Sequence, residues 1–266
     1  MAVEIRGMPF AGSAHHLPIH RRLYGLGSVF GKTLRDARLG MLVVAGLLGV
    51  MTLAGGMTMS STYGTEEARL ELAAMSGDMP PMMRGMYGNP VNVDTLGGFI
   101  SWHYGPYFAL FAGLWSILAL SSTLAAEARR GSLDFALATP NSRRAIALEK
   151  VAGHMVAIGI AMAIVAIVAW LTGLMGASFP ADAIAPAAAV AFAVGIGVRA
   201  LMAGSIAFAL APFLGRGSAA GIAGAVMLGG YVINSYRTVV PAFDTLSGGW
   251  VAPFVMSTIN TRIVHR

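Results

Sequence analysis

The sequence has no cysteine and few charged residues, and both shortages narrow what the protein can be. Without cysteine among its 266 residues, disulfide frameworks, thiolate metal sites and cysteine nucleophiles are excluded. Charged residues make up 11% of the chain and hydrophobic residues 56%, with a mean hydropathy of +0.69. A soluble domain carries roughly 25% charged residues, and a disordered chain is rich in charge rather than poor in it. The composition therefore indicates an all-α, polytopic membrane protein.

Five stretches are long and apolar enough to cross a bilayer as helices, because such a helix needs about 20 residues. They are 39–60, 100–126, 151–177, 187–213 and 218–234. Pro186 stands where the first turn of a helix tolerates proline. After residue 240 only a short apolar piece follows, which predicts a re-entrant or incomplete sixth element. The expected organisation is a cytoplasmic segment 1–38, a transmembrane domain 39–240 and an irregular or truncated segment 241–266.

Lys and Arg are distributed unequally between the loops on the two sides of the membrane. Loops on one side carry twelve and loops on the other carry three: 1–38 (six), 127–150 (five) and 214–217 (one), against 61–98 (two), 178–186 (none) and 235–249 (one). Because cytoplasmic loops are enriched in these residues, the N-terminus of this multi-pass protein is expected in the cytoplasm. The net charge of +6 is thus a topology signal and not a nucleic-acid-binding face. The acidic loop 61–98 then faces outward, with a short helix expected over Glu66–Met75.

Residues 20–38 have the pattern of an amphipathic helix. Leu23, Leu26, Phe30, Leu34 and Ala37 repeat at intervals of three and four residues, with most cations elsewhere. The pattern predicts a helix lying in the inner membrane interface among lipid headgroups; the alternative is a solvated juxtamembrane helix.

A segment within this stretch, Gly27–Thr33, resembles a phosphate-binding loop. It has three residues between its glycines where that motif requires four, and no strand precedes it. We therefore expect no ATP bound by this chain.

The predicted spans contain no acidic residue in their interiors, and this disfavours proton-coupled transport. The one charge deep in a span is Arg199. A mid-membrane arginine costs at least ~2.5–3.5 kcal/mol, so it should face the bundle or a watery cavity. It is a candidate wall of a translocation path for an anionic or carbonyl-bearing substrate; the alternative is a structural arginine paired with backbone carbonyls.

No catalytic or metal-binding constellation is evident. His103 and His154 are isolated, without partners at ligand spacing, which favours structural roles. No G-x-S-x-G elbow is present. Glycine pairs such as Gly46 and Gly49, or Gly217 and Gly221, predict close helix packing or a dimer seam.

The connection between the second and third spans predicts a short cytoplasmic helix. Gly131 can end the second span, Ser132 can cap a new helix, and Pro140 can stop it. Leu133 and Leu137 give that helix an apolar face. A short helix held between two spans is suited to docking in a groove on a partner; the alternative is a loop helix resting on the membrane.

This connection resembles the second cytoplasmic segment of the permease subunits of type-2 ABC exporters, Glu-x3-Gly-Ser/Thr-Leu-x3-Leu-x2-Pro-x-Ser-Arg. The matching residues are Glu127, Gly131, Ser132, Leu133, Leu137, Pro140, Ser142 and Arg143. The resemblance implies that 131–140 is a coupling helix seated on a separate ATPase, which would bind ATP and Mg.

The same resemblance implies a location in the bacterial cytoplasmic membrane, further partners and a substrate class. A second permease copy or half would complete the substrate path, which would lie between the two, with membrane lipid around them. The substrate would be a small hydrophobic or amphipathic molecule such as a drug or antibiotic. The alternatives are a non-transport membrane protein that anchors or assembles a cytoplasmic partner and, with little support, an intramembrane enzyme.

Overall fold

The computed structural model describes residues 28–87, 90–123, 143–236 and 240–246, and in these residues all regular structure is helical. The α-helices are α2 (Val29–Ser61), α3 (Glu66–Gly77), α4 (Pro81–Tyr87), α5 (Leu96–Phe99), α6 (Gly105–Thr123), α9 (Arg143–Met175), α10 (Pro186–Ser235) and α11 (Pro241–Leu246). A π-helix, η1 (Ile100–Tyr104), joins α5 to α6, and a 3-10 turn, η2 (Pro180–Asp182), precedes α10.

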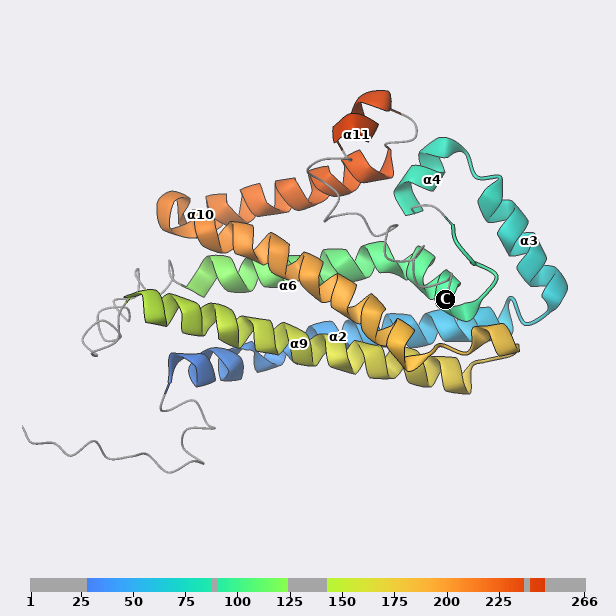
Figure 1. The fold of residues 1–266 in the computed structure, drawn as a ribbon, viewed down its shortest axis with the longest axis horizontal. Coiled ribbons are helices and arrows are strands. Elements are labelled where there is room, and N and C mark those ends of the chain that lie inside the picture. The colour runs from blue at the N-terminus through green and yellow to red at the C-terminus, as the bar shows by residue number, and fades with distance from the viewer. Residues whose placement is uncertain (1–27, 88–89, 124–142, 237–239, 247–266) are drawn as a thin grey trace, which may run out of the picture.

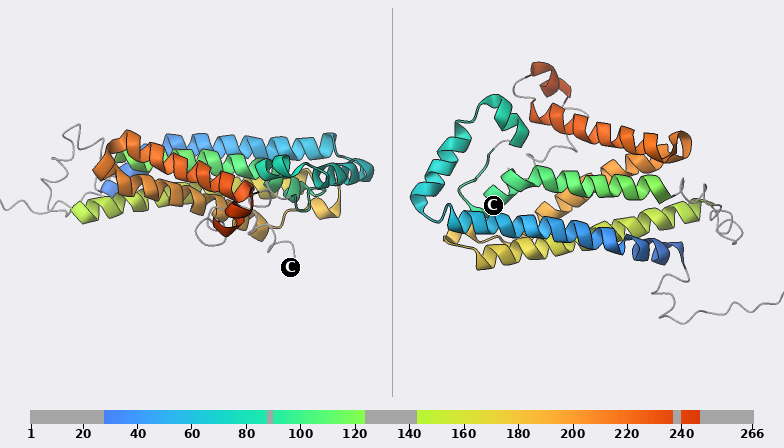
Figure 2. Two further views of the ribbon diagram at one scale, coloured as in Figure 1. Left: turned by 90° about the horizontal axis from the view of Figure 1, so that it is seen from above. Right: turned by 180° about the vertical axis from the view of Figure 1, so that it is seen from behind.

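The long helices α2, α6, α9 and α10 form one elongated bundle (Figures 1 and 2). The end of α6 and the start of α9 lie at one end of this bundle, while α3 lies across the other, which we call the α3 end (Figure 1). The predicted helix 66–75 is confirmed as α3, whose N-cap Thr65 accepts a hydrogen bond from the backbone N–H of Ala68 at 3.2 Å. The start of α10 at Pro186 is likewise as predicted.

The described part of the chain contains four helices long and apolar enough to cross a membrane, where the sequence predicted five spans. The difference arises in α10, whose 50 residues include both 187–213 and 218–234. A straight helix of that length would extend about 75 Å, far beyond a bilayer core of about 30 Å. Gly215 interrupts it with φ 78° and ψ 167°, a conformation that favours glycine. The chain reverses its direction there (Figures 1 and 2), so the fourth and fifth predicted spans are the two arms of α10.

The predicted interfacial helix 20–38 differs from what the structure shows. Its residues from Val29 onward belong to α2 without a break before the first span, whereas a helix lying in the membrane plane would need one. Residues 20–27 lie outside the described part. The start of α2 is held against α9, because the backbone N–H of Phe30 donates to Glu149 Oε2 at 3.0 Å. At Gly153 of α9, an added Cβ would lie 3.0 Å from Thr33, so the two helices approach closely.

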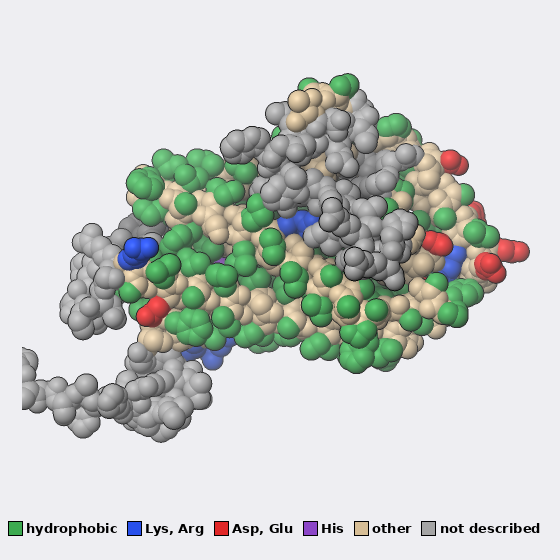
Figure 3. All heavy atoms as spheres, in the orientation of Figure 1, with side chains coloured by type: hydrophobic (Ala, Val, Ile, Leu, Met, Phe, Trp, Pro, Cys, Tyr) green, Lys and Arg blue, Asp and Glu red, His purple; other side chains and the backbone are tan. Residues whose placement is uncertain are grey.

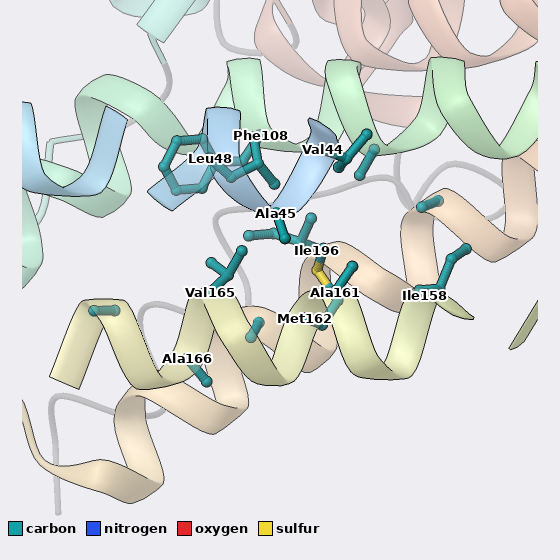
Figure 4. Packing of buried hydrophobic residues seen from close by; sticks show 14 of the residues in the cluster. Val44, Ala45, Leu48, Phe108, Ile158, Ala161, Met162, Val165, Ala166 and Ile196 are labelled. Carbon is teal, nitrogen blue, oxygen red and sulfur yellow. The ribbon is translucent and has the colours of Figure 1, made fainter. Parts of the chain in front are cut away.

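Four helices contribute to the main hydrophobic core (Figure 4). α2 supplies Leu48, α6 supplies Phe108, α9 supplies Val165 and α10 supplies Ile196, all fully buried. Most of the remaining core residues are alanines. Such small residues let helices approach closely, and in lipid this close packing replaces the hydrophobic effect as the force that holds helices together.

The outer surfaces of the same helices are apolar (Figure 3). Large hydrophobic side chains such as Val50, Leu118, Ile167 and Val194 are exposed along the four helices. Acidic side chains gather at the α3 end of the face shown in Figure 3. A monomeric soluble protein does not expose so much apolar surface. These exposed side chains therefore indicate that the bundle is embedded in a membrane.

Candidate functional site

The predicted partner-docking segment lies largely outside the described residues. Glu127, Gly131, Ser132, Leu133, Leu137, Pro140 and Ser142 all fall within 124–142, and Arg143 is the first residue of α9. What the structure describes is the pair of helices that this segment joins: α6 ends and α9 begins at the same end of the bundle (Figure 1).

A group of polar side chains lies between α6 and α9 within the bundle. Ser116 Oγ and His154 Nε2 are 3.0 Å apart, and both residues are buried. The His154 ring also packs edge-on against Trp115, with ring centroids 5.2 Å apart. His154 thus packs against Trp115 and Ser116; the described residues contain no group of three His, Cys, Asp or Glu that could hold a metal.

The glycines of the long helices divide between packed and exposed positions. A Cβ at Gly204 would overlap Ser116, and one at Gly197 would lie 3.1 Å from Met162, so both allow α10 to pack closely. Gly46, Gly217 and Gly221 have no neighbour within 4 Å of such a Cβ. The predicted dimer seam stays a prediction.

Arg199 lies on the buried side of α10 and is 9% exposed. Its neighbours in sequence on the same side, Ile196, Ala200 and Ala203, are fully buried. Arg199 is therefore a buried charge within a long apolar helix. Its role in a translocation path stays a prediction.

The best-defined polar constellation in the described residues is at the α3 end and centres on Arg69 and Asp182. Arg69 of α3 forms a bidentate ion pair with Asp182 of η2, with Nη1–Oδ1 and Nη2–Oδ2 distances of 2.5 and 2.8 Å. Asp182 is fully buried and Arg69 is 6% exposed. Paired, planar contacts of this kind are the strongest form of side-chain hydrogen bonding.

Further donors and acceptors surround this ion pair. Asp182 accepts from the backbone N–H groups of Leu96, Ser178 and Phe179 at 3.0–3.1 Å. Arg69 donates to the carbonyl oxygens of Tyr63 at 2.8 Å and Asp94 at 3.0 Å, and its guanidinium lies 4.4 Å from the ring centroid of Phe179. We call this set the Arg69–Asp182 cluster. It joins three segments that are far apart in sequence: α3, the loop before α5, and the loop between α9 and α10.

Sequence reasoning missed this cluster. Arg69 and Asp182 are 113 residues apart, and no periodic pattern relates two residues across such a distance. In the sequence, Arg69 contributed only to the count of Lys and Arg in the loops expected on the outer side of the membrane. The signal that was present is Asp182 itself, a single charged residue in the otherwise uncharged loop 178–186 between two apolar spans. A buried carboxylate there requires a cationic partner.

A cavity of about 280 Å³ adjoins the cluster. One wall is formed by the loop and helix 91–101, and the other by residues 181–192, with Ala169 of α9 between them. The hydrogen bond from the Leu96 N–H to Asp182 joins these two walls directly. Arg199 is not among the lining residues.

A continuous series of aromatic rings lies beside this cavity. The rings of Tyr104 and Phe108 have centroids 6.4 Å apart, and those of Phe108 and Phe192 are 5.9 Å apart, with Phe192 lining the cavity. Towards the α3 end, His103 is stacked between Phe99 and Tyr87, at 5.3 and 5.8 Å. His103 thus packs among aromatic rings, and the described residues provide it with no metal-binding group.

The sequence of this helical bundle matches one family of membrane proteins. A family model described as "ABC-2 family transporter protein" matches residues 30–235, which include all four long apolar helices almost completely. Neither a curated protein nor a solved structure matches the chain. Because the family model covers more than half of the sequence, the chain belongs to the ABC-2 family of transporters, as a multi-pass membrane permease subunit.

Proposed function

We propose that this permease exports a hydrophobic or amphipathic molecule, such as a drug, antibiotic or lipid-like compound, across the bacterial cytoplasmic membrane. The energy would come from ATP and Mg bound on a separate ATPase chain that docks on residues 131–140. A second copy of the permease would complete the path. The N-terminus and the 131–140 segment would lie in the cytoplasm.

The observation that carries this proposal is the position of the docking segment between two long helices. The segment connects α6 to α9, and α9 in turn holds the start of α2 through the Phe30–Glu149 hydrogen bond. α9 also packs on α10 in the core, where Gly197 approaches Met162. A displacement of the segment would therefore reach all four helices through packed contacts, and packed elements of this kind shift between discrete arrangements rather than deform gradually.

The choice of energy source follows from the charges in the membrane. Proton-coupled transporters place carboxylates inside their spans. Here Glu149 lies in the second turn of α9, and Asp182 is bound by Arg69 in the loop before α10. The stretches 40–60, 105–123 and 150–175 contain no Asp or Glu. These stretches thus offer no carboxylate relay, which supports an external energy source.

The test uses Gly131→Pro and Leu137→Asp in the permease co-expressed with the ATPase that co-purifies with it. Both variants should lose transport and transport-stimulated ATP hydrolysis by about tenfold or more, since a charge on the docking face, or a proline that changes the turn between the second span and the docking helix, removes ~1.4 kcal/mol or more of docking energy. Ala138→Asp, off the Leu133–Leu137 face, is the matched control and should remain close to wild type.

All three variants should insert in the membrane as wild type does. Unchanged ATPase association and stimulation in Gly131→Pro and Leu137→Asp would refute the coupling helix. If no ATPase co-purifies at all, the anchoring or assembly function becomes the better account.

Arg199→Ala should change the range of exported substrates or their apparent affinity while leaving basal ATP hydrolysis intact. The reason is that Arg199 is a buried cation within α10, and anionic or carbonyl-bearing groups of a substrate would pass beside it. Arg199→Lys, which keeps the charge, should be closer to wild type. Export measured over a panel of anionic, neutral and cationic compounds checks this, and an unchanged profile for all of them would leave Arg199 a structural role only.

A further inference from the structure

The cavity at the α3 end has walls that are built by unusual backbone conformations. Ile100 and Ser101, which line it, belong to the π-helix η1. Asn92, also in the lining, has φ 49°, the one positive φ at a non-glycine position in the described residues. At Gly98 an added Cβ would overlap the backbone carbonyl of Asn92. π-helical turns and such backbone outliers occur often at functional sites, because the fold must stabilise them at a cost.

The Arg69–Asp182 cluster holds these walls in place. Leu96 and Asp182, joined at 3.0 Å, lie next to the lining residues Thr95, Gly97, Ala181 and Ala183. A buried ion pair with five further hydrogen bonds is a rigid support, since each of its groups is satisfied only in one arrangement. The cavity is therefore preformed, as most small-molecule sites are.

The lining determines what chemistry the cavity accepts. None of its described lining residues carries a charge, and the nearby Asp182 is already neutralised by Arg69. The floor consists of the buried residues Ala169, Ala189 and Ile100, with the Phe192 ring beside them. Polar side chains are confined to Asn92, Thr95 and Ser101, and Asn92 is exposed at the mouth. An uncharged apolar group fits the floor, and a polar group fits the mouth.

The volume and the position of the cavity distinguish between two possible ligands, a small single-chain molecule and a two-chain membrane lipid. The volume of about 280 Å³ is slightly below the range of roughly 300–1,000 Å³ for drug-sized ligands, so the cavity holds one chain or ring system. Its exposed lining residues are Asn92, Ala181, Ala183 and Ala185, which lie between α4 and α5 or, with the short turn η2, between α9 and α10. The mouth thus opens at the α3 end of the bundle and not along the apolar sides, where two-chain lipids lie.

We propose that this cavity binds the uncharged apolar group of a small single-chain amphiphile, which enters between the loops at Asn92 and Ala181–Ala185 while its polar part stays at the mouth. This inference goes beyond the proposed function, since it requires neither an ATPase nor transport. Binding should therefore be observed with the permease alone.

The experiment uses the full chain in phosphatidylcholine nanodiscs and two photoreactive probes. One is an alkyl glucoside with a diazirine at the end of its chain, and the other is phosphatidylcholine with the same diazirine on one acyl chain. After irradiation, peptides from 91–101 and 181–192 should carry the glucoside label, and unlabelled alkyl glucoside should compete for it. Labelling spread over the membrane-facing helices without enrichment in these peptides would overturn the proposal. Equal labelling of them by the lipid probe would also overturn it, by showing that the bilayer fills the cavity.

Matched variants locate the label. Ala188→Trp fills the cavity, because Ala188 lines it, whereas Ala187→Trp places the same side chain at the exposed neighbouring position outside the lining. Glucoside labelling should fall about tenfold in Ala188→Trp and stay at the wild-type level in Ala187→Trp. If Ala188→Trp does not fold, Ala183→Phe at the exposed mouth should give the same loss. Wild-type labelling in whichever cavity variant folds would refute the site.

Discussion

Asp182→Ala is expected to lower the free energy of unfolding by about 3–5 kcal/mol, the range measured when one partner of a buried ion pair is removed. The change leaves the Arg69 guanidinium buried without its carboxylate. It also removes the acceptor of three backbone N–H groups, those of Leu96, Ser178 and Phe179. Each unsatisfied buried donor adds to the cost, by ~1–3 kcal/mol. Denaturant unfolding in mixed micelles, followed by tryptophan fluorescence, measures the loss.

Comparing the losses of stability in the two single variants tests which residue organises the Arg69–Asp182 cluster. Arg69→Ala leaves Asp182 with its three backbone donors, so it should cost less than Asp182→Ala. An Arg69→Met, Asp182→Leu double variant should recover only part of the stability, because those N–H groups remain without an acceptor. The control is Asp94→Ala, since the Asp94 side chain is exposed and its backbone carbonyl still accepts from Arg69. It should change stability by less than about 0.5 kcal/mol. A larger loss in Arg69→Ala than in Asp182→Ala would contradict this account.

Gly98→Ala is expected to destabilise the protein by about 3 kcal/mol, the upper end of the cost of overpacking a core. The new Cβ would overlap the carbonyl oxygen and carbon of Asn92. Both are backbone atoms, so no side-chain rotation can relieve the overlap and the loop 91–98 must move. The same unfolding measurement checks this, and Gly46→Ala is the control because no atom lies within 4 Å of a Cβ there. The control should be neutral or gain up to ~1 kcal/mol from helix propensity.

Gly98→Ala and Asp182→Ala should not be additive. Gly98 allows segment 91–98 to fold back so that Gly98 contacts the carbonyl of Asn92. The same segment contains Leu96, whose N–H donates to Asp182. A variant that has displaced this loop has already lost part of the cluster, so the second substitution should cost less than it does alone. A double-mutant cycle would show an interaction free energy of about 1 kcal/mol or more. Strict additivity would indicate that the cavity wall and the cluster are independent.

The sequence was sufficient for the features that depend on local patterns. Helix α3 was predicted as 66–75 and extends over 66–77, because a threonine cap and two first-turn glutamates are local signals. Pro186 begins α10 as predicted, and the apolar stretches appear as the long helices. Family membership followed from a motif of residues at fixed spacing, 127–143, which no tertiary information is needed to recognise.

Predictions that depended on tertiary contacts were incomplete. Residues 29–38 had an amphipathic pattern, yet they extend the first span. The pattern did not determine which helix packs there: α9 contacts this stretch through Glu149, which accepts from the Phe30 N–H, and through Gly153, which lies against Thr33. The reversal within α10 was expected near 214–217, but only the positive φ of Gly215 shows where the two arms meet.

Composition and periodicity by themselves determined that this protein is a helical membrane bundle, because each span must be apolar over its whole length whatever it packs against. Only the tertiary structure decided how the α3 end is closed. Arg69, Asp182 and the walls of the adjoining cavity come from segments far apart in the chain. A buried charge signals that a partner must exist, but long-range folding selects which residue that partner is.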